Sequence, residues 1–174
     1  MADSNITKRA LAAALRELME EKPFEKISVG DICERCDMNR KSFYYHFRDK
    51  YDLVNWIYDI EFIAGVSKKE YPAAWDLLQD VCTYLYENRL FYRKALQMEG
   101  QNSFSEHFRE YLQPALHTYL EGDIRDKETL EFYLTFFTDA YLCAIERWLL
   151  KREPEPPGQF IDRMQSCMRS FGGE

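Results

Sequence analysis

The stretch "DMNRKSFYYHFRDKYDL", residues 37–53, interleaves basic and aromatic side chains. Its basic residues are Arg40, Lys41, His46, Arg48 and Lys50, set around Phe43, Tyr44, Tyr45 and Phe47. The whole chain carries a formal net charge of −7, and residues 1–50 hold 10 Lys and Arg against 9 Asp and Glu, while the rest hold 13 against 21. An acidic body argues against general attraction to polyanions. Any nucleic-acid contact would therefore have to come from this local patch.

Apolar residues recur at helical spacing and seldom alternate in twos, so we predict an all-α fold. A first helix is expected over about 5–20, capped by Ser4 or Asn5, with an inner face of Ile6, Leu11, Ala14, Leu15, Leu18 and Met19. Ser28, with Asp31 three residues later, predicts the start of a short second helix. Asn39 is a good N-cap for a third, "RKSFYYHF".

Asp49 predicts the start of a fourth helix that runs to about residue 66, with Leu53, Ile57 and Ile60 facing inward. The short second and third helices, separated by "CDM", form a helix-turn-helix pattern. We expect a three-helix DNA-binding domain over residues 1–50 and a helical bundle for effector binding and dimerisation over 51–174. The helix over 50–66 would link the two.

The second part of the chain shows longer amphipathic helices. Pro72 is a plausible first residue of a helix that continues to the break at Gly100, and Pro114 predicts a kink or interruption in the next one. A helix over about 126–151 is apolar around much of its circumference, which suggests burial by more than one neighbour. The segment "PGQFIDRMQSCMRSF" forms the expected last helix.

The basic stretch can be read as a recognition helix. Phe43 and Phe47 are four residues apart, so they share a face that can anchor the helix to the core. The first residues of a recognition helix meet base edges in the major groove, while its flanks meet phosphate. Arg40 suits a bidentate contact with guanine, and Lys41 could reach guanine or phosphate. Composition alone also allows a plain solvated cationic surface.

The order of the residues favours a DNA recognition helix over a plain solvated surface. The segment "ISVGDICERCDMNRKSFYYHFRDKYDLV", residues 27–54, resembles the DNA-binding signature of TetR-type transcriptional regulators. The shared pattern is a Ser/Thr-capped helix, a short turn, a polar and basic helix ending in Tyr-x-His-Phe, and then a Lys before an apolar helix. One departure is the turn, where Cys36-Asp37-Met38 replaces the common Ala-Gly-Val; Asp tolerates the left-handed conformation that such a turn needs. Past residue 66 the resemblance weakens sharply. The segments "YLYENRLFYRKAL" and "NRKSFYYHFRDKYDLVNWIYDIEF" are faintly similar to the branch containing regulators of dihydroxyacetone-kinase operons.

The resemblance implies roles for individual positions. Arg40, Lys41 and Ser42 match positions that touch bases or nearby phosphates. Tyr44, Tyr45, His46 and Lys50 match positions that hold the DNA backbone, and Ser28 matches a helix start that often donates to phosphate. With the N-cap Asn39, the expected DNA-binding set is Ser28, Asn39, Arg40, Lys41, Ser42, Tyr44, Tyr45, His46 and Lys50.

The sequence gives little support for a metal site, a thiol-redox site or a catalytic site. Cys33 and Cys36 form a C-x-x-C pair, but no second pair supplies two more zinc ligands, and His107 and His117 are ten residues apart. Packing between the second and third helices is the preferred role of the cysteines, with a thiol-redox switch as the alternative. No phosphate cradle or nucleophile motif is present. We expect no metal, no cofactor and no enzymatic activity.

Aromatic residues of the body suggest an effector pocket, although core packing explains each one singly. The candidate lining is Trp75, Tyr84, Phe91, Phe104, Phe108, Tyr111, Phe136 and Tyr141. The last two helices would pair across a two-fold axis, as in TetR-type regulators. The candidate dimer interface is Phe137, Tyr141, Ile145, Trp148, Phe160, Met164, Cys167 and Met168. The alternative is a monomer whose last helix covers that surface.

The expected protein is a sequence-specific, double-stranded-DNA-binding regulator, a homodimeric repressor with a small-molecule effector and an approximately palindromic operator. Control of an activator or repressor by a partner protein, or by Cys33 and Cys36, is the alternative. The chain lacks a signal-peptide pattern or a membrane-spanning run, and its odd cysteine count suits a reduced, cytoplasmic location. The residues do not specify the effector, the operator, the regulated genes or the sign of regulation.

Overall fold

The computed structural model describes residues 2–98, 103–120 and 124–171, and within these ranges every regular element is helical. The predicted all-α class is confirmed. The chain packs as two compact units, Met1–Gly65 with Leu90–His107, and Val66–Arg89 with Phe108–Glu174. The predicted boundary between a DNA-binding domain and an effector-binding domain, at residues 50 and 51, stays a prediction. The first packing unit extends beyond residue 50, because the fourth helix buries Leu53 and Ile57 in its core.

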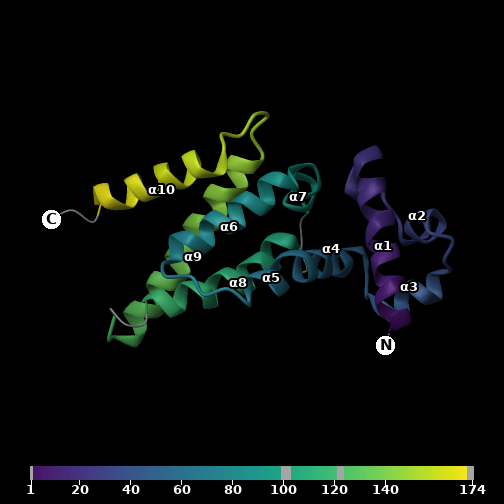
Figure 1. The fold of residues 1–174 in the computed structure, drawn as a ribbon, viewed down its shortest axis with the longest axis horizontal. Coiled ribbons are helices and arrows are strands. Elements are labelled where there is room, and N and C mark those ends of the chain that lie inside the picture. The colour runs from purple at the N-terminus through teal and green to yellow at the C-terminus, as the bar shows by residue number, and fades with distance from the viewer. Residues whose placement is uncertain (1, 99–102, 121–123, 172–174) are drawn as a thin grey trace. The chain divides into compact units, whose positions relative to one another are not determined.

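The first unit begins with a helix-turn-helix arrangement (Figure 1). Its elements are α1 (Ala2–Glu21), the 3-10 turn η1 (Phe24–Lys26), α2 (Val29–Arg35), α3 (Arg40–His46) and α4 (Lys50–Tyr58). α1 contacts α2, α3 and α4, and α2 contacts α3. The side chains that fill this core are fully buried: Leu11, Leu15, Ile32, Phe43 and Leu53.

Local chemistry at the helix starts matches the sequence predictions. Ser28 and Asp31 form a capping box on α2, in which Ser28 Oγ accepts from the Asp31 amide at 3.1 Å and Asp31 Oδ2 accepts from the Ser28 amide at 2.8 Å. Asn39 Oδ1 accepts from the Ser42 amide at 2.8 Å, and Asp49 Oδ1 accepts from the Asp52 amide at 2.8 Å. Each side chain satisfies an amide that the helix itself leaves unpaired.

The turn between α2 and α3 depends on Asp37, whose φ of 53° places it in the left-handed region. The tolerance expected of Asp at this departure from the family pattern is confirmed. The Met38 amide closes the turn by donating to the Cys33 carbonyl at 2.8 Å.

Three details differ from the sequence predictions. α1 begins at Ala2, so neither Ser4 nor Asn5 caps it, and Ile6 is 65% exposed instead of facing the core. Ile60 is also exposed, because α4 continues into the π-helical segment η2 (Asp59–Ile63). The wider i→i+5 turn shifts the side chains that follow, and Phe62 is buried and stacked on Tyr58 instead.

The second part of the first unit packs aromatic rings beside the end of α4. Tyr92, on α7 (Arg89–Ala95), lies edge-on to Tyr58 at 6.0 Å, and Phe104 lies 5.2 Å from Tyr58. His107 Nε2 and Asp59 Oδ1 are 2.7 Å apart. These contacts hold the π-helical segment within the unit.

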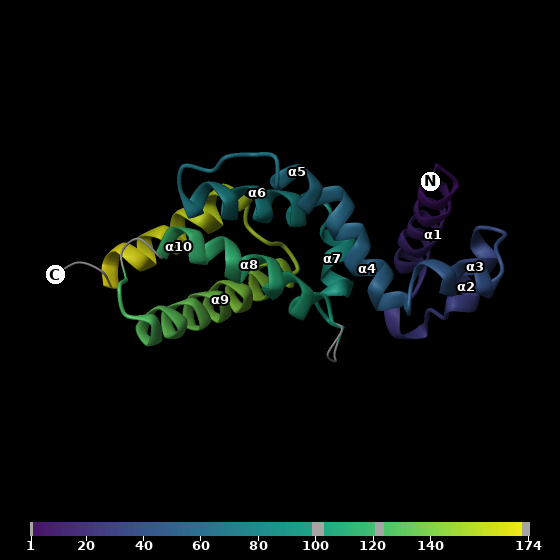
Figure 2. The ribbon, with the colours of Figure 1, turned by 90° about the horizontal axis from the view of Figure 1, so that it is seen from below.

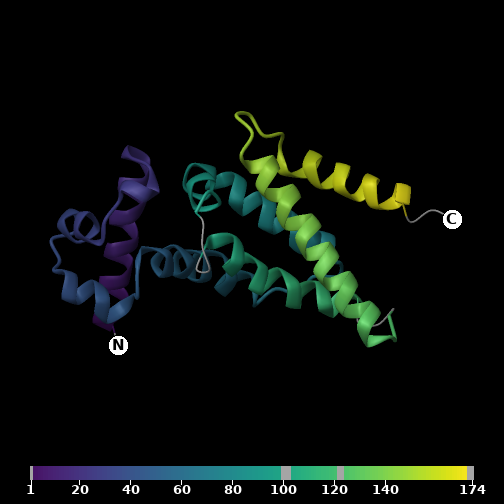
Figure 3. The same cartoon turned by 180° about the vertical axis from the view of Figure 1, so that it is seen from behind.

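The second unit is built mainly from long helices. They are α6 (Ala74–Glu87), α8 (Phe104–Leu120), whose first four residues belong to the first unit, α9 (Lys127–Leu149) and α10 (Pro157–Phe171). The three-residue α5 (Ala64–Val66) spans the boundary between the units along the chain. α6 packs against α9 and α10 (Figure 2, Figure 3). The Trp148 ring stacks on Phe160 at 4.6 Å, and its Nε1 donates to the Glu155 carbonyl at 2.9 Å. Trp148 therefore joins the end of α9 to α10 inside one protomer.

The prediction that a helix starts at Pro72 is wrong, and of the two outcomes predicted for Pro114, a kink or an interruption, the interruption does not occur. α6 starts at Ala74, after Pro72, and the expected single helix to residue 98 is divided at Asn88 into α6 and α7. α8 continues through Pro114, which is exposed, without an interruption. Among the described residues, no helix combines the length and apolarity needed to cross a membrane.

Candidate DNA-binding interface

α3 presents a polar and basic outer surface. Phe43 is fully buried and Phe47 is 4% exposed, so the two rings fix the helix to the core as predicted. Arg40 and Lys41 are exposed, and the Tyr44 and Tyr45 rings are 58% and 84% exposed. The exposed parts of these two rings remain available to a partner.

Ser42 and His46, two members of the predicted set, make side-chain contacts with residues at the start of α3 and within it. Ser42 Oγ donates to Asn39 Oδ1 at 3.2 Å, so both side chains serve the N-cap of the helix. The His46 ring lies edge-on to Tyr45 at 4.9 Å near the end of the helix. Half-buried Ser42 and His46 are four residues apart and share one face of α3, beside the exposed Lys41, Tyr44 and Tyr45.

Arg40 lies back against α2. A Cβ atom placed on Gly30 would be 2.5 Å from Arg40 Nη2, so the guanidinium uses space that only a glycine leaves open. Gly30 and Arg40 border a shallow groove of about 360 Å³ between the starts of α2 and α3, together with Ser28 and Asn39. The structure thus brings together three positions of the expected set, Ser28, Asn39 and Arg40, and it adds Gly30, which sequence reasoning missed.

Ser28 and Asp31 form the other side of this groove. Lys22 Nζ donates to Asp31 Oδ2 at 2.8 Å, and with the Ser28 amide it lowers the pKa of Asp31 to about 2. Asp31 therefore stays ionised and keeps the start of α2 fixed. The Ser28 hydroxyl oxygen accepts from the Asp31 amide, and the hydroxyl group also helps to lower the pKa of Asp31.

Lys50 differs from the rest of the predicted set. Its Nζ donates to the carbonyl oxygens of Phe24 at 2.7 Å and Ile27 at 2.8 Å, and it lies 4.3 Å above the Phe24 ring. Burial lowers the pKa of Lys50. An ammonium group has three donors, and two of them are used here by good hydrogen bonds. These bonds hold η1 against the start of α4, and the phosphate contact expected of Lys50 from the family resemblance stays a prediction.

Two further cations lie beside α3 and were not in the predicted set. Arg48 follows the helix with 76% of its side chain exposed, and its amide donates to Asp52 Oδ2 at 2.9 Å. Lys8 on α1 lies 5.5 Å above the Phe47 ring. Arg48 lies between α3 and α4 and was within the opening stretch of the sequence, so a charged residue beside α3 could have been included; Lys8 comes from another element, and no local pattern indicated it.

The two cysteines lie where packing was expected. Cys33 is 3% exposed, and Cys36 Sγ lies 3.2 Å from the Ile32 carbonyl oxygen. Burial raises the pKa of both thiols, which lowers the thiolate fraction that redox chemistry requires. These surroundings favour the packing role over a redox switch. Within the described ranges, no three His, Cys, Asp or Glu residues are grouped as metal ligands would be.

The candidate effector residues fall in different packing units. Phe91 and Phe104 are buried in the first unit, where Tyr92 contacts both. The remaining six belong to the second unit, in which Trp75 and Tyr141 lie edge to face at 5.8 Å. Phe136 is 55% exposed on the outside of α9, so it does not suit a pocket wall.

Three candidate interface residues are already used inside the protomer. Ile145, Trp148 and Phe160 are at most 8% exposed, so they cannot offer area to a second copy. Cys167 is exposed, and Phe137, Tyr141, Met164 and Met168 are half-buried. α9 also exposes Phe132 and Tyr133, which the predicted interface did not include.

Family models match both parts of the chain. Residues 10–57 match bacterial regulatory proteins of the tetR family, and residues 74–170 match a transcriptional regulator C-terminal region. The HTH-type dhaKLM operon transcriptional activator DhaS of Lactococcus lactis subsp. lactis (strain IL1403) is 26% identical over 157 residues, which cover 84% of this chain and 81% of that protein.

Two solved structures share the fold. A dihydroxyacetone kinase operon activator, DhaS, has a TM-score of 0.65 at 20% identity and covers 95% of this chain and 97% of its own. A TetR transcriptional regulator from Streptococcus agalactiae 2603V has a TM-score of 0.72 at 18% identity, with 95% of each chain covered. The similarity to regulators of dihydroxyacetone-kinase operons, noted from the sequence, is confirmed. The chain belongs to the TetR family of bacterial regulators, and it is a transcriptional regulator and not an enzyme.

Proposed function

We propose that the protein acts as a homodimer that inserts two copies of α3 into successive major grooves of an approximately palindromic operator. The observation that supports this most is the outward surface of α3, where Arg40, Lys41 and Tyr45 are exposed while Phe43 and Phe47 anchor the helix. A two-fold dimer that presents two such helices about 34–36 Å apart can meet half-sites one helical turn apart.

The residues divide between base reading and backbone contact. Arg40 would donate bidentately to a guanine, with Lys41 and Ser42 reaching the neighbouring base or phosphate. Tyr44, Tyr45, His46, the Ser28 hydroxyl and Arg48 would hold phosphates, and these contacts fix the register without reading sequence. Asn39 and Lys50 act on the fold in this scheme, since their side chains bond to the protein backbone.

Phosphate contacts should make the affinity strongly dependent on salt. Neutralising phosphates releases counterions, and log K falls by about 0.9 for each contact per tenfold rise in salt. The net charge of −7 adds repulsion between the body and DNA, so binding depends on the local patch. Non-specific binding should accordingly be weak.

Dimerisation is assigned to the outer faces of α9 and α10. Phe132, Tyr133 and Phe136 expose a row of rings on α9, in which Phe132 stacks on Phe136 at 6.3 Å. Exposed aromatic rows of this kind mark interaction surfaces. The exposed Cys167 and half-buried Met168 lie on α10, which packs against α6 in the same unit.

The similarity to the DhaS protein of Lactococcus lactis favours activation over the repression expected from the sequence. That protein is a dhaKLM operon transcriptional activator, and its similarity covers 84% of this chain. We infer that this protein activates an operon of the dihydroxyacetone-kinase type. Control would come from an effector, either a small molecule in the second unit or a protein, that binds one arrangement of the two recognition helices better than the other.

The experiment that tests the DNA assignment is selection of bound fragments from the genomic DNA of the source organism, followed by titration of the recovered site. We expect an approximate two-fold repeat and a loss of roughly ten- to a hundredfold in affinity for Arg40→Ala. Arg125→Ala, which removes an exposed arginine far from α3 in sequence, is the matched control and should bind as the wild type does. Recovered sites without two-fold symmetry would contradict the dimeric arrangement.

The sign of regulation needs a reporter gene downstream of the recovered site. Activation predicts higher expression when the protein is present and loss of that increase for Arg40→Ala. Lower expression in the presence of the wild-type protein would show repression and overturn the inference from the relative.

A further inference from the structure

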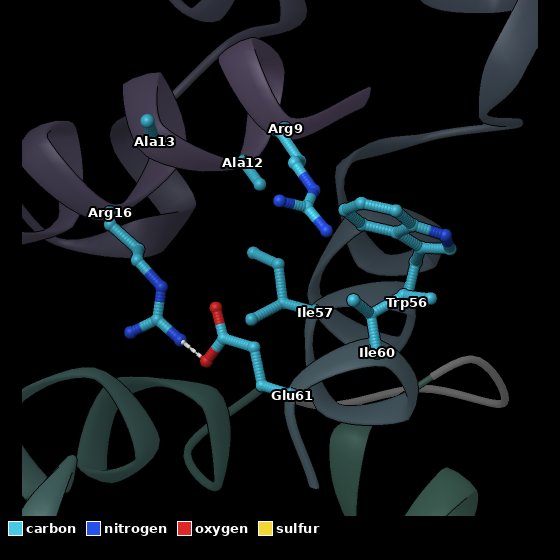
Figure 4. A pocket seen from close by; sticks show the side chains of 8 residues that line it. All are labelled: Arg9, Ala12, Ala13, Arg16, Trp56, Ile57, Ile60 and Glu61. Carbon is cyan, nitrogen blue, oxygen red and sulfur yellow. Dashed lines mark hydrogen bonds and ion pairs between the residues drawn. The ribbon is translucent and has the colours of Figure 1, made fainter. Parts of the chain in front are cut away.

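The first unit contains a groove that the DNA-binding scheme does not use. It has a volume of about 390 Å³ and lies between α1 and the segment formed by α4 and η2 (Figure 4). Arg9 and Arg16 line it from α1, and Trp56, Ile57 and Ile60 line it from the opposite side. Small-molecule sites have volumes of about 300–1,000 Å³, so the groove suits a small organic ligand.

One wall of the groove is apolar and fixed in place. Phe47 lies 5.6 Å from the Trp56 ring in an edge-to-face contact, which restrains the indole. Ile57 is 1% exposed and closes the floor, whereas Ile60 is 43% exposed at the rim. Ile60 is on the π-helical segment η2, and π-helical turns occur often at functional sites. The wall thus combines the half-buried Trp56 ring, over which the Lys8 ammonium lies at 5.6 Å, with an aliphatic edge at the rim.

The other wall carries two guanidinium groups with different surroundings. Arg16 forms an ion pair with Glu61 and lies 4.4 Å above the Phe91 ring, so it is a fixed part of the groove. Arg9 is exposed and forms no ion pair or hydrogen bond within residues 2–98, 103–120 and 124–171. In Figure 4 its side chain extends from α1 toward Trp56. An unpaired guanidinium therefore lies next to an aromatic ring.

We propose that this groove binds a small aromatic carboxylate, with its ring against Trp56 and Ile60 and its carboxylate on Arg9. A guanidinium matches a carboxylate through two parallel hydrogen bonds, and ring faces pair favourably at 4.5–7 Å. Two arginines against one glutamate give the groove a positive balance, which excludes cationic ligands. Its volume is too small for a partner helix. The site does not depend on operator reading, because no residue of α2 or α3 lines it.

The direct test uses the full ¹⁵N-labelled chain and the probe 2-naphthoate, with the neutral isostere 2-naphthamide as the comparison ligand. We expect saturable shifts of amide signals within residues 9–16 and 56–61, and affinity at least tenfold lower for the amide because its charge is missing. Equal affinity of the two probes, or shifts confined to residues 124–171, would overturn the proposal. So would the absence of saturable binding at millimolar concentration.

Two variants locate the probe within the groove. Arg9→Gln should weaken 2-naphthoate binding by roughly tenfold and leave 2-naphthamide binding unchanged. Ala13→Phe should weaken both probes, because Ala13 is an exposed residue at the rim and a ring there would fill the groove without overpacking the core. Arg125→Gln is the control for loss of an exposed arginine. Unchanged naphthoate affinity in Arg9→Gln would exclude the assigned carboxylate contact.

Discussion

The side-chain ammonium of Lys50, the first residue of α4, lies 2.8 Å from the carbonyl oxygen of Ile27, just after η1. The same ammonium donates to the Phe24 carbonyl at 2.7 Å and lies over the Phe24 ring. The end of η1 leads directly to Ser28, the N-cap of α2. Lys50 thus connects the start of α4 with the segment that positions the helix-turn-helix.

This geometry predicts that Lys50→Met destabilises the protein without changing how salt affects DNA binding. Loss of the ammonium leaves two carbonyl oxygens without their donor, which should lower the free energy of unfolding by about 1–3 kcal/mol. The slope of log K against log salt should stay at the wild-type value, whereas Lys41→Met should reduce it by about one unit. Urea unfolding and DNA titrations at several salt concentrations measure the two effects.

Lys50→Arg serves as a second variant, since it keeps a charge at the position if Lys50→Met folds poorly. A reduction of the salt slope by about one unit in Lys50→Met, with no such reduction in Lys50→Arg, would restore the phosphate contact expected from the family resemblance. It would also remove the assignment of Lys50 to the fold.

Gly30 and Arg40 should be energetically coupled. Ala is a better helix residue than Gly by roughly 0.5–1 kcal/mol, so Gly30→Ala in α2 should stabilise the protein where space allows. In the wild type the new Cβ atom would meet Arg40 Nη2 at 2.5 Å, and the guanidinium must move away. The full gain is therefore expected only in the Arg40→Ala background. Thermal or urea unfolding of the four proteins in the cycle measures this coupling.

The matched control for this cycle is Lys41→Ala. Lys41 is the neighbouring exposed cation, and the three atoms nearest to a Cβ atom on Gly30 all belong to Arg40. Additive effects of Gly30→Ala and Arg40→Ala would show that Arg40 does not use the space over Gly30. Additivity with Lys41→Ala is expected in either case.

Local side-chain chemistry made much of this fold predictable. Ser28, Asn39 and Asp49 cap helices where the sequence predicted, because a cap needs only a suitable side chain and the next few amides. Asp37 was likewise predictable, since the left-handed turn selects among few residue types. Phe43 and Phe47 followed from spacing alone.

The error at Ile60, and the unexpected surroundings of Trp148 and Lys50, arise where distant segments or a change of helix type decide the outcome. Ile60 was placed inward by 3.6-residue spacing, but the π-helical turn of η2 gives that place to Phe62. Trp148 was expected at a dimer interface, yet Phe160 from α10 covers it. Lys50 matched a DNA-contacting position, and its carbonyl partners lie more than twenty residues earlier. Periodicity in one segment carries no information on such partners.

The ion pair between Lys22 and Asp31 gives a prediction about pH. Lys22, then the Ser28 amide, lower the pKa of Asp31 from 3.8 to about 2 in the folded protein. Because the folded pKa is below the unfolded value, this carboxylate stabilises the fold above about pH 4 and loses that contribution as the pH falls through 2. Lys22→Met should raise the pKa of Asp31 toward 3.8. A carboxyl NMR titration measures the shift directly.

Lys26→Met is the control for the general effect of removing a nearby positive charge, since Lys26 is exposed and is not among the groups that lower the pKa of Asp31. An Asp31 pKa that moves equally in both variants would show that general charge, and not the Lys22 contact, is responsible.

The exposed ring row on α9 predicts that Phe132→Ser combined with Phe136→Ser converts the dimer to a monomer. The two rings are 68% and 55% exposed in the protomer, so their removal costs little folding stability while it deletes apolar interface area. Light scattering should give a mass near 20.8 kDa for the double variant and twice that mass for the wild type. Leu90→Ser is the matched control, because Leu90 is also 68% exposed but lies on α7. A double variant that stays dimeric would place the contact between copies elsewhere. A wild-type protein with the mass of a monomer at micromolar concentration would show that there is no such contact.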